Sequence, residues 1–191
     1  MDPNLESLTS LLPEKVSVEK ADLIVHAGDL WPRRLVLARQ GKLNSLPMAV
    51  VSPTCVEDIQ ALLKWAHHTR VPLVPFGGGS GVCGAVQLER ESYVAVDLQQ
   101  MKAIKEIQTE SMIVTAEAGI FGGELENALN QKGLTLGHFP TSYEISTLGG
   151  WISTRASGQF STAYGSIEDM VIALKAVLPN GDLFETKCVP R

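Results

Sequence analysis

The chain has 191 residues, of which 45% are hydrophobic and 19% charged, enough for one globular domain or two small lobes. Sixteen Lys and Arg residues against 21 Asp and Glu residues give a formal net charge of −5. The largest basic cluster is the pair Arg33-Arg34, whereas nucleic-acid binders carry a basic face. We therefore expect no nucleic-acid partner.

Membrane, secretion and metal signals are also missing from the sequence. No apolar run approaches the roughly 18 residues of a membrane span, and residues 1–6 are acidic, unlike a signal peptide. Cys55, Cys83 and Cys188 are far apart and have no Cys or His at ligand spacing. These features predict a cytoplasmic protein with no transmembrane segment, no disulfide framework and no bound metal.

The first 46 residues are expected to form a helical lead-in. Leu5, Leu8, Leu11 and Leu12 recur at helical spacing before Pro13, which predicts a short helix there. Residues 33–39 fit either a helix or a strand.

Residues 47–103 are expected to form a parallel α/β lobe. The apolar residues 48–51 predict a buried strand, and Thr54 with Glu57 predicts a capping box for the helix that follows. Residues 71–75 and 93–98 predict two further strands, so the lobe begins with a βαβ unit.

Residues 104–191 are expected to form a second lobe, an antiparallel sheet with helices. Asn180-Gly181 predicts a hairpin turn before a strand at 183–186. The other predicted strands are 104–107, 112–118, 134–136 and 170–177, and the predicted helices are 124–131 and 148–156.

The segment from Gly77 to Gly84 contains five glycines in eight positions, directly after a predicted strand. Consecutive glycines let backbone N–H groups converge on an anion, because no Cβ blocks a close approach. A tight exposed turn is the alternative interpretation. A P-loop is excluded because no Gly-Lys-Ser/Thr follows.

A nicotinamide-binding Rossmann module is a rival hypothesis, because residues 79–84 match G-x-G-x-x-G and Asp97 ends the next strand. However, residues 85–92 are too few for a crossover helix. Pro72 and Pro75 are also unfavourable in a central strand. The match therefore reads as accidental.

A second donor-rich segment covers residues 138–158, with several Ser and Thr hydroxyls, a Gly-Gly pair and Arg155. Hydroxyls and a helix N-terminus both donate to a diphosphate; alternatively, this is a polar loop in which Thr147 caps a helix. Two such segments favour one large ligand held between two lobes. No catalytic constellation stands out, so a non-catalytic ligand-binding or structural module is a third hypothesis.

Four motifs occur in a recognisable order and resemble the FAD-binding domain of the vanillyl-alcohol oxidase and p-cresol methylhydroxylase superfamily over residues 47–187. They are Pro75–Ser80, Glu117-Ala118-Gly119, Gly137–Gly158 and Tyr164–Asp169. Within that superfamily, residues 146–158 are most similar to alkyldihydroxyacetone-phosphate synthases and bacterial FAD-linked oxidases, with glycolate oxidases as further relatives.

The resemblance implies an α+β fold whose two lobes hold FAD between them. It implies non-covalent attachment, since the loops offer Gly-Ser-Gly and Thr-Ser-Tyr where covalent members use His or Cys. The cofactor-binding residues it implies are Pro75, Gly77, Gly78, Gly79, Ser80, Gly81, Val82, Pro140, Thr141, Ser142, Ser146, Thr147, Gly149, Gly150, Ser153, Thr154, Arg155, Ala156 and Ser157.

The resemblance also implies a longer enzyme, of which this chain is an FAD-binding piece without catalytic residues and inactive alone. That enzyme would act on a small molecule, either by oxidising a 2-hydroxy acid or by exchanging an acyl for an alkyl group. A sheet cut short leaves an unpaired edge strand, so a homodimer is a further expectation.

Overall fold

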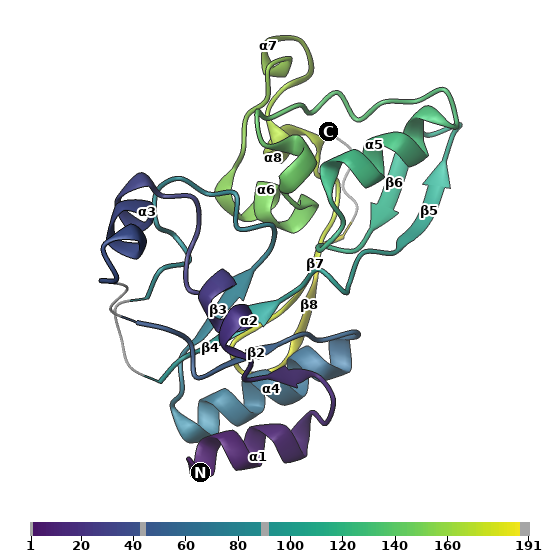
Figure 1. The fold of residues 1–191 in the computed structure, drawn as a ribbon. Helices are drawn as coiled ribbons and strands as arrows, with labels where there is room; N and C mark the ends of the chain where they lie inside the picture. The colour runs from purple at the N-terminus through teal and green to yellow at the C-terminus, as the bar shows by residue number, and fades with distance from the viewer. Residues whose placement is uncertain (1, 43–44, 89–91, 188–191) are drawn as a thin grey trace.

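The structure is a computed structural model that describes residues 2–42, 45–88 and 92–187 (Figure 1). The first half of the chain is built around a four-stranded sheet in the order β1-β2-β4-β3. β2, β4 and β3 are parallel, whereas β1 is antiparallel to β2. α4 (Val56–Thr69) makes the crossover that parallel strands require. The strands are β1 (Val16–Ser17), β2 (Ala49–Val51), β3 (Leu73–Phe76) and β4 (Val94–Asp97).

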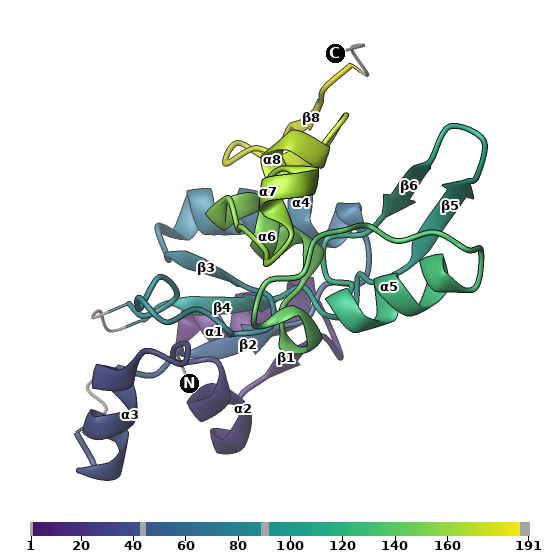
Figure 2. The same ribbon diagram turned by 90° about the horizontal axis from the view of Figure 1, so that it is seen from above.

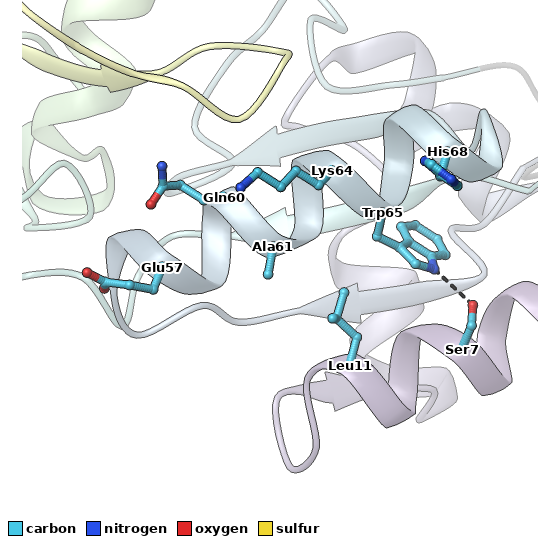
Figure 3. A pocket seen from close by; sticks show the side chains of 8 residues that line it. All are labelled: Ser7, Leu11, Glu57, Gln60, Ala61, Lys64, Trp65 and His68. Carbon is cyan, nitrogen blue, oxygen red and sulfur yellow. Dashed lines mark hydrogen bonds between the residues drawn. The ribbon is translucent and has the colours of Figure 1, made fainter.

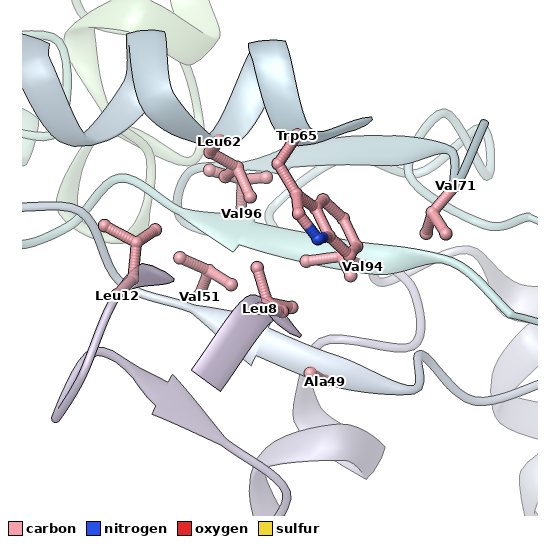
Figure 4. Close-up of a cluster of buried hydrophobic side chains, with 9 residues drawn as sticks. All are labelled: Leu8, Leu12, Ala49, Val51, Leu62, Trp65, Val71, Val94 and Val96. Carbon is pink, nitrogen blue, oxygen red and sulfur yellow. The ribbon is translucent and has the colours of Figure 1, made fainter. Parts of the chain in front are cut away.

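The main hydrophobic core joins this sheet to α1 (Pro3–Leu11) and α4 (Figure 4). Val51 and Val94 belong to this cluster with Leu8 and Leu62. Because side chains alternate along a strand, Val50 and Ala95 face the opposite side of the sheet, and they are buried too. Both faces of the parallel strands are therefore covered, as the apolar run at residues 48–51 predicts.

The N-terminal region contains more structure than its sequence predicts. The predicted leading helix is confirmed as α1, and residues 33–39 lie in α3 (Pro32–Arg39), with Pro32 in the first turn where its missing N–H costs nothing. β1 and α2 (Lys20–Val25) were not predicted. A two-residue strand and a six-residue helix are too short to show hydrophobic periodicity.

The helix after β2 is confirmed, but its predicted cap is wrong. The N-cap is Cys55 rather than Thr54, and its capping-box partner is Asp58 rather than Glu57. The Asp58 carboxylate accepts from the backbone N–H groups of Thr54 (2.8 Å) and Cys55 (3.3 Å). The same carboxylate lies 2.5 Å from Nζ of Lys15. This ion pair explains why Asp58, and not Glu57, is the capping-box partner.

The second half is built from two hairpins instead of one sheet. β5 (Ile104–Gln108) pairs with β6 (Ile113–Ala116), and β7 (Lys175–Val177) pairs with β8 (Leu183–Glu185), both antiparallel. The hairpin at Asn180-Gly181 is confirmed, with Gly181 at φ +87°. Figure 2 shows α5 (Gly122–Asn130) beside the β5–β6 hairpin, away from the four-stranded sheet. The predicted α+β class is confirmed.

Two predicted strands of this half are wrong in whole or in part. Residues 134–136 form no strand, because the N–H of Leu136 donates to the Glu126 carboxylate (3.1 Å) instead of to a neighbouring strand. The strand predicted at residues 170–177 contains only β7, because Met170 ends α8 (Ile167–Met170). Apolar runs of this length do not distinguish strands from short helices.

Short helices carry the chain through residues 140–170: η1 (Tyr143–Ile145), α6 (Leu148–Thr154), α7 (Ser161–Tyr164) and α8. Thr147 is the N-cap of α6, and its hydroxyl accepts from the N–H of Gly150 (3.3 Å). Thr147 also forms an isolated antiparallel bridge with Phe121, so α6 is tied to the start of α5.

Within residues 2–42, 45–88 and 92–187, no helix is long and apolar enough to cross a bilayer. The same ranges contain no cluster of three or more His, Cys, Asp or Glu residues arranged to hold a metal ion. The domain boundaries after residues 46 and 103 stay predictions. Cys188 lies outside the described residues.

Asp58 provides a test of the first lobe. Burial acts to raise the pKa of Asp58, but the ion pair with Lys15 and the backbone N–H groups outweigh it and hold this pKa well below its ordinary value. A carboxylate with a lowered folded pKa stabilises the protein above its unfolded pKa, and this contribution disappears as the pH falls.

We therefore predict that Asp58→Asn lowers the free energy of unfolding by about 1–3 kcal/mol at neutral pH. The difference in the free energy of unfolding between wild type and variant should narrow as the pH falls from about 5 to about 2. Urea unfolding across this range measures it, and a gap independent of pH would contradict the prediction.

Candidate functional site

The glycine-rich loop, residues 77–84, leaves β3 at the carboxyl edge of the parallel strands. This edge is where open parallel α/β sheets bind their ligands. Gln99, which follows β4 at the same edge, donates its amide to the carbonyl oxygen of Gly77 (2.8 Å). The start of the loop is therefore held by the neighbouring strand.

The second donor-rich segment packs directly on the first two glycines of this loop. A Cβ on Gly77 would overlap the hydroxyl of Thr147, and a Cβ on Gly78 would overlap the carbonyl oxygen of Ile145. Only glycine permits this approach. The structure thus brings the glycine-rich loop against a second loop, residues 138–147, with about seventy residues between the contacting positions.

The N–H groups of this loop form a donor set for an anion. Among the described residues, the backbone N–H groups from Gly77 to Val82 donate to no protein oxygen. Gly79 has φ +63°, a conformation in which successive N–H groups can turn towards one point. Pro75, just before the loop, is exposed, and Ser80 is half-buried within it. This donor set fits a diphosphate.

The last glycines of the loop serve a different purpose. A Cβ on Gly81 would lie 2.7 Å from Oδ2 of Asp29, and a Cβ on Gly84 would lie 2.8 Å from the Trp31 ring. Gly84 also has φ +77°. Their spacing is therefore explained by packing against residues 29–31.

The remaining requirements of a nicotinamide-binding unit are also unmet. Residues 85–88 contain no helix. The Asp97 carboxylate, the candidate ribose ligand, is engaged: Oδ1 accepts from the N–H of Gln99 (3.0 Å) and Oδ2 lies 3.4 Å from Nε2 of His26. The G-x-G-x-x-G match is accidental.

His26 is a buried group behind the loop that sequence reasoning missed. Its ring lies 4.5 Å from the Phe76 ring, centroid to centroid, and its Nδ1 lies 2.8 Å from the carbonyl oxygen of Asp22. Burial lowers the pKa of His26, but Asp97 and the Asp22 carbonyl outweigh it and raise this pKa above its ordinary value. His26 therefore braces the ends of β3 and β4.

The hydroxyls at the end of the second loop are bonded within the chain. Ser146 donates to the carbonyl oxygen of Ser142 (2.7 Å) and accepts from Nε1 of Trp151 (2.6 Å). Ser146 and Thr147 are buried, as is Pro140, whereas Thr141 is exposed. The side chains of Ser146 and Thr147 therefore shape the loop.

The residues in and after α6 are predicted to contact the cofactor. The hydroxyls of Ser153 and Thr154 donate to the carbonyl oxygens of Gly149 (2.7 Å) and Gly150 (2.8 Å). The N–H of Gly149 donates to the carbonyl oxygen of Ala118 (2.7 Å), so the helix start contacts the Glu117-Ala118-Gly119 motif. These side chains bond locally, and their contact with a cofactor stays a prediction.

The chain leaves α6 through Arg155, which has φ +53° and pairs with Glu168 of α8 (2.9 Å). The hydroxyl of Ser157 lies 2.9 Å from the hydroxyl of Ser166, and Ala156, between Arg155 and Ser157 in the sequence, is half-buried. These contacts fix the segment after α6 against α8.

His138 is a second buried group without an assigned role in the sequence. It is 2% exposed, its ring packs edge-on against Trp151 at 4.8 Å, and burial lowers its pKa. Within the described part of the chain, neither ring nitrogen has a hydrogen-bond partner. Such a group is uncommon in a folded protein, and nothing in the local sequence marks it.

A groove between α1 and α4 lies apart from both loops (Figure 3). The indole of Trp65 donates to the hydroxyl of Ser7 (2.9 Å) across it. It contains no residue of either loop and is not the candidate site. It is lined by Ser7, Leu11, Glu57, Gln60, Ala61, Lys64, Trp65 and His68.

Comparison with known proteins agrees with this geometry. The chain is 36% identical over 174 residues to an alkyldihydroxyacetonephosphate synthase of Dictyostelium discoideum, covering 90% of this chain and 28% of that protein. It is 40% identical over 146 residues to the FAD-linked oxidoreductase YgcU of Escherichia coli (strain K12), covering 76% and 30%.

Solved structures show the same fold. An alkyldihydroxyacetonephosphate synthase superposes with a TM-score of 0.90 at 33% identity, covering 100% of this chain and 36% of that one. p-Cresol methylhydroxylase gives 0.76 at 23% identity, covering 96% and 34%, which shows the fold alone. The chain thus spans about a third of the length of the relatives it matches.

A family model described as "FAD binding domain" matches residues 47–187, which include both loops and α6. The cofactor of this family fits the unpartnered donors of the glycine loop. The protein belongs to the FAD-binding domain family.

Proposed function

We propose that the chain binds FAD non-covalently between its two loops, with the diphosphate on the N–H groups of residues 77–82. The observation that carries this proposal is a glycine loop whose N–H groups have no protein acceptor among the described residues. The contact of Gly77 and Gly78 with residues 145–147 supports it, because it closes one side of the loop.

In this proposal the backbone of the first loop supplies the diphosphate donors, while the second loop runs beside them. The side chains of Ser146 and Thr147 are held within the chain, so these residues act by shape. In that loop Thr141 is exposed, whereas the hydroxyl of Ser142 donates to that of Ser146 (3.2 Å). The exposed residues Ser153 to Arg155 are the candidates at the other end.

We further propose that the whole protein is an FAD-dependent enzyme acting on a small molecule. Its relatives include proteins named alkyldihydroxyacetonephosphate synthase, D-lactate dehydrogenase and glycolate oxidase subunit. FAD, when bound, supplies a two-electron acceptor, and the protein supplies orientation. Oxidation of a 2-hydroxy acid and acyl-for-alkyl exchange are the two candidate reactions.

Two further expectations belong to this proposal. The cysteine spacing supports a cytoplasmic location. The β7–β8 hairpin, whose strands pair only with each other among the described residues and whose strand β8 is exposed, supports a homodimer through an unpaired sheet edge.

The first test is a titration of the purified chain with FAD followed by flavin fluorescence, with NAD as the control. We expect saturable binding of FAD and none of NAD. Gly78→Val should weaken FAD binding by about tenfold or more, since a side chain there would push residues 145–146 away and open the loop.

Gly133→Val is the matched control. It introduces a side chain at φ +72° with no atom within 4 Å of its Cβ, so it lowers stability without touching either loop. Circular dichroism checks that both variants fold. Unchanged FAD affinity in Gly78→Val, or no FAD binding by the wild-type chain, would contradict the proposal that the chain binds FAD between these two loops.

The mode of attachment is tested separately. Because the loops offer no His or Cys at the positions used by covalent members, acid or SDS denaturation should release all the flavin into solution. Fluorescence of the separated protein and supernatant measures this. Flavin that stays with the denatured chain would overturn the non-covalent assignment, and Cys83→Ser would then test the exposed thiol of the first loop.

A further inference from the structure

A buried carboxylate holds the far end of the glycine loop. Asp29 is 2% exposed and lies between α2 and α3. Its Oδ2 accepts from the N–H groups of Gly84 (3.0 Å) and Ala85 (3.2 Å), and its Oδ1 accepts from the N–H of Trp31 (3.0 Å). One side chain therefore ties residues 84–85 to a segment more than fifty positions earlier.

The backbone around Asp29 strengthens this connection. The N–H of Leu30 donates to the carbonyl oxygen of Gly81 (2.8 Å), three residues before the contacts of the carboxylate. Gly81 and Gly84 lack the Cβ atoms that would collide with Asp29 and Trp31. Residues 81–85 are thus fixed at both ends against residues 29–31.

The sign of the charge shows what kind of role this side chain has. A carboxylate beside the expected diphosphate repels it, so Asp29 cannot act there by attraction. Its carboxylate instead accepts from the N–H groups of Gly84 and Ala85, which follow the donor segment 77–82. The N–H groups of residues 77–82 then remain free for a ligand.

We propose that Asp29 is a positioning residue for the FAD diphosphate, acting through the conformation of residues 81–85. This inference rests on the proposed function of the loop. Without the carboxylate, the loop spends less time in the arrangement that receives a diphosphate, and the apparent affinity falls by the same fraction.

Two substitutions separate the effect of the Asp29 hydrogen bonds from the effect of its negative charge. Asp29→Ala removes all three acceptor contacts and should weaken FAD binding by about tenfold or more. Asp29→Asn keeps one oxygen that can accept from both Gly84 and Ala85, while its amide faces the N–H of Trp31. Its loss should be smaller, about threefold, which is a partial rescue by the conservative variant.

Asp58→Ala is the matched control, because Asp58 is also a buried carboxylate that accepts from two backbone N–H groups. Its partners are Lys15, Thr54 and Cys55, none of which belongs to either loop. It should lower the thermal midpoint as Asp29→Ala does, yet leave the Kd for FAD and the visible spectrum of bound flavin unchanged.

Hydrogen exchange without FAD provides an independent readout. Asp29→Ala should speed exchange at the amides of Gly84 and Ala85, while Asp58→Ala should speed it at those of Thr54 and Cys55. Equal losses of FAD affinity in the two alanine variants, or tighter FAD binding in either Asp29 variant, would overturn the proposal. If the wild-type chain fails to bind FAD, the proposed function fails, whereas unchanged exchange at the amides of Gly84 and Ala85 contradicts the Asp29 inference alone.

Discussion

The close approach of two backbones at Gly77 and Gly78 is the constraint on which the rest of this structure depends. Residues 145–147 occupy the space where side chains would otherwise stand. From there Thr147 caps α6 and bridges to Phe121, and the carbonyl oxygen of Ser146 accepts from the N–H of Gly122 (3.0 Å). One contact without Cβ atoms therefore joins the parallel sheet to α5 and α6. A side chain at Gly78 would disturb both the loop and the junction between the halves.

The two loops differ in whether their polar groups are hydrogen-bonded within the chain. In the second loop, the hydroxyls of Ser146 and Thr147 are used within the chain, and Trp151 is anchored by the first of them. In the first loop, the N–H groups of residues 77–82 have no protein acceptor among the described residues. A buried hydroxyl without a partner costs free energy, whereas loop N–H groups near solvent can await a ligand. The second loop therefore uses its buried hydroxyls for internal hydrogen bonds, whereas the first loop leaves its N–H groups without a protein acceptor among the described residues.

Hydrophobic periodicity predicted the elements that carry the fold, and it failed where tertiary contacts decided the outcome. The β2-α4-β3 unit, β4 and the last hairpin follow from apolar runs, helical spacing and turn residues. The capping box of α4 is formed by Cys55 and Asp58 instead of Thr54 and Glu57, because Lys15, 43 positions away, pairs with Asp58. Residues 134–136 are apolar enough for a strand, but Glu126 takes the N–H of Leu136. Neither partner is visible in a local window of sequence.

The candidate site likewise contains parts that the sequence reveals and parts that only the structure reveals. Its loops are visible in the sequence because glycine clusters are unusual. Asp29 and His26 carry no local signal, since they are distinguished by burial and by distant partners, and His138 is distinguished by its burial alone. The G-x-G-x-x-G match shows the converse. Gly79 is set by its backbone conformation, whereas Gly81 and Gly84 are set by contact with Asp29 and Trp31. Spacing that resembles a dinucleotide fingerprint can thus arise from packing on another segment, and only the elements that follow the glycines tell the two origins apart.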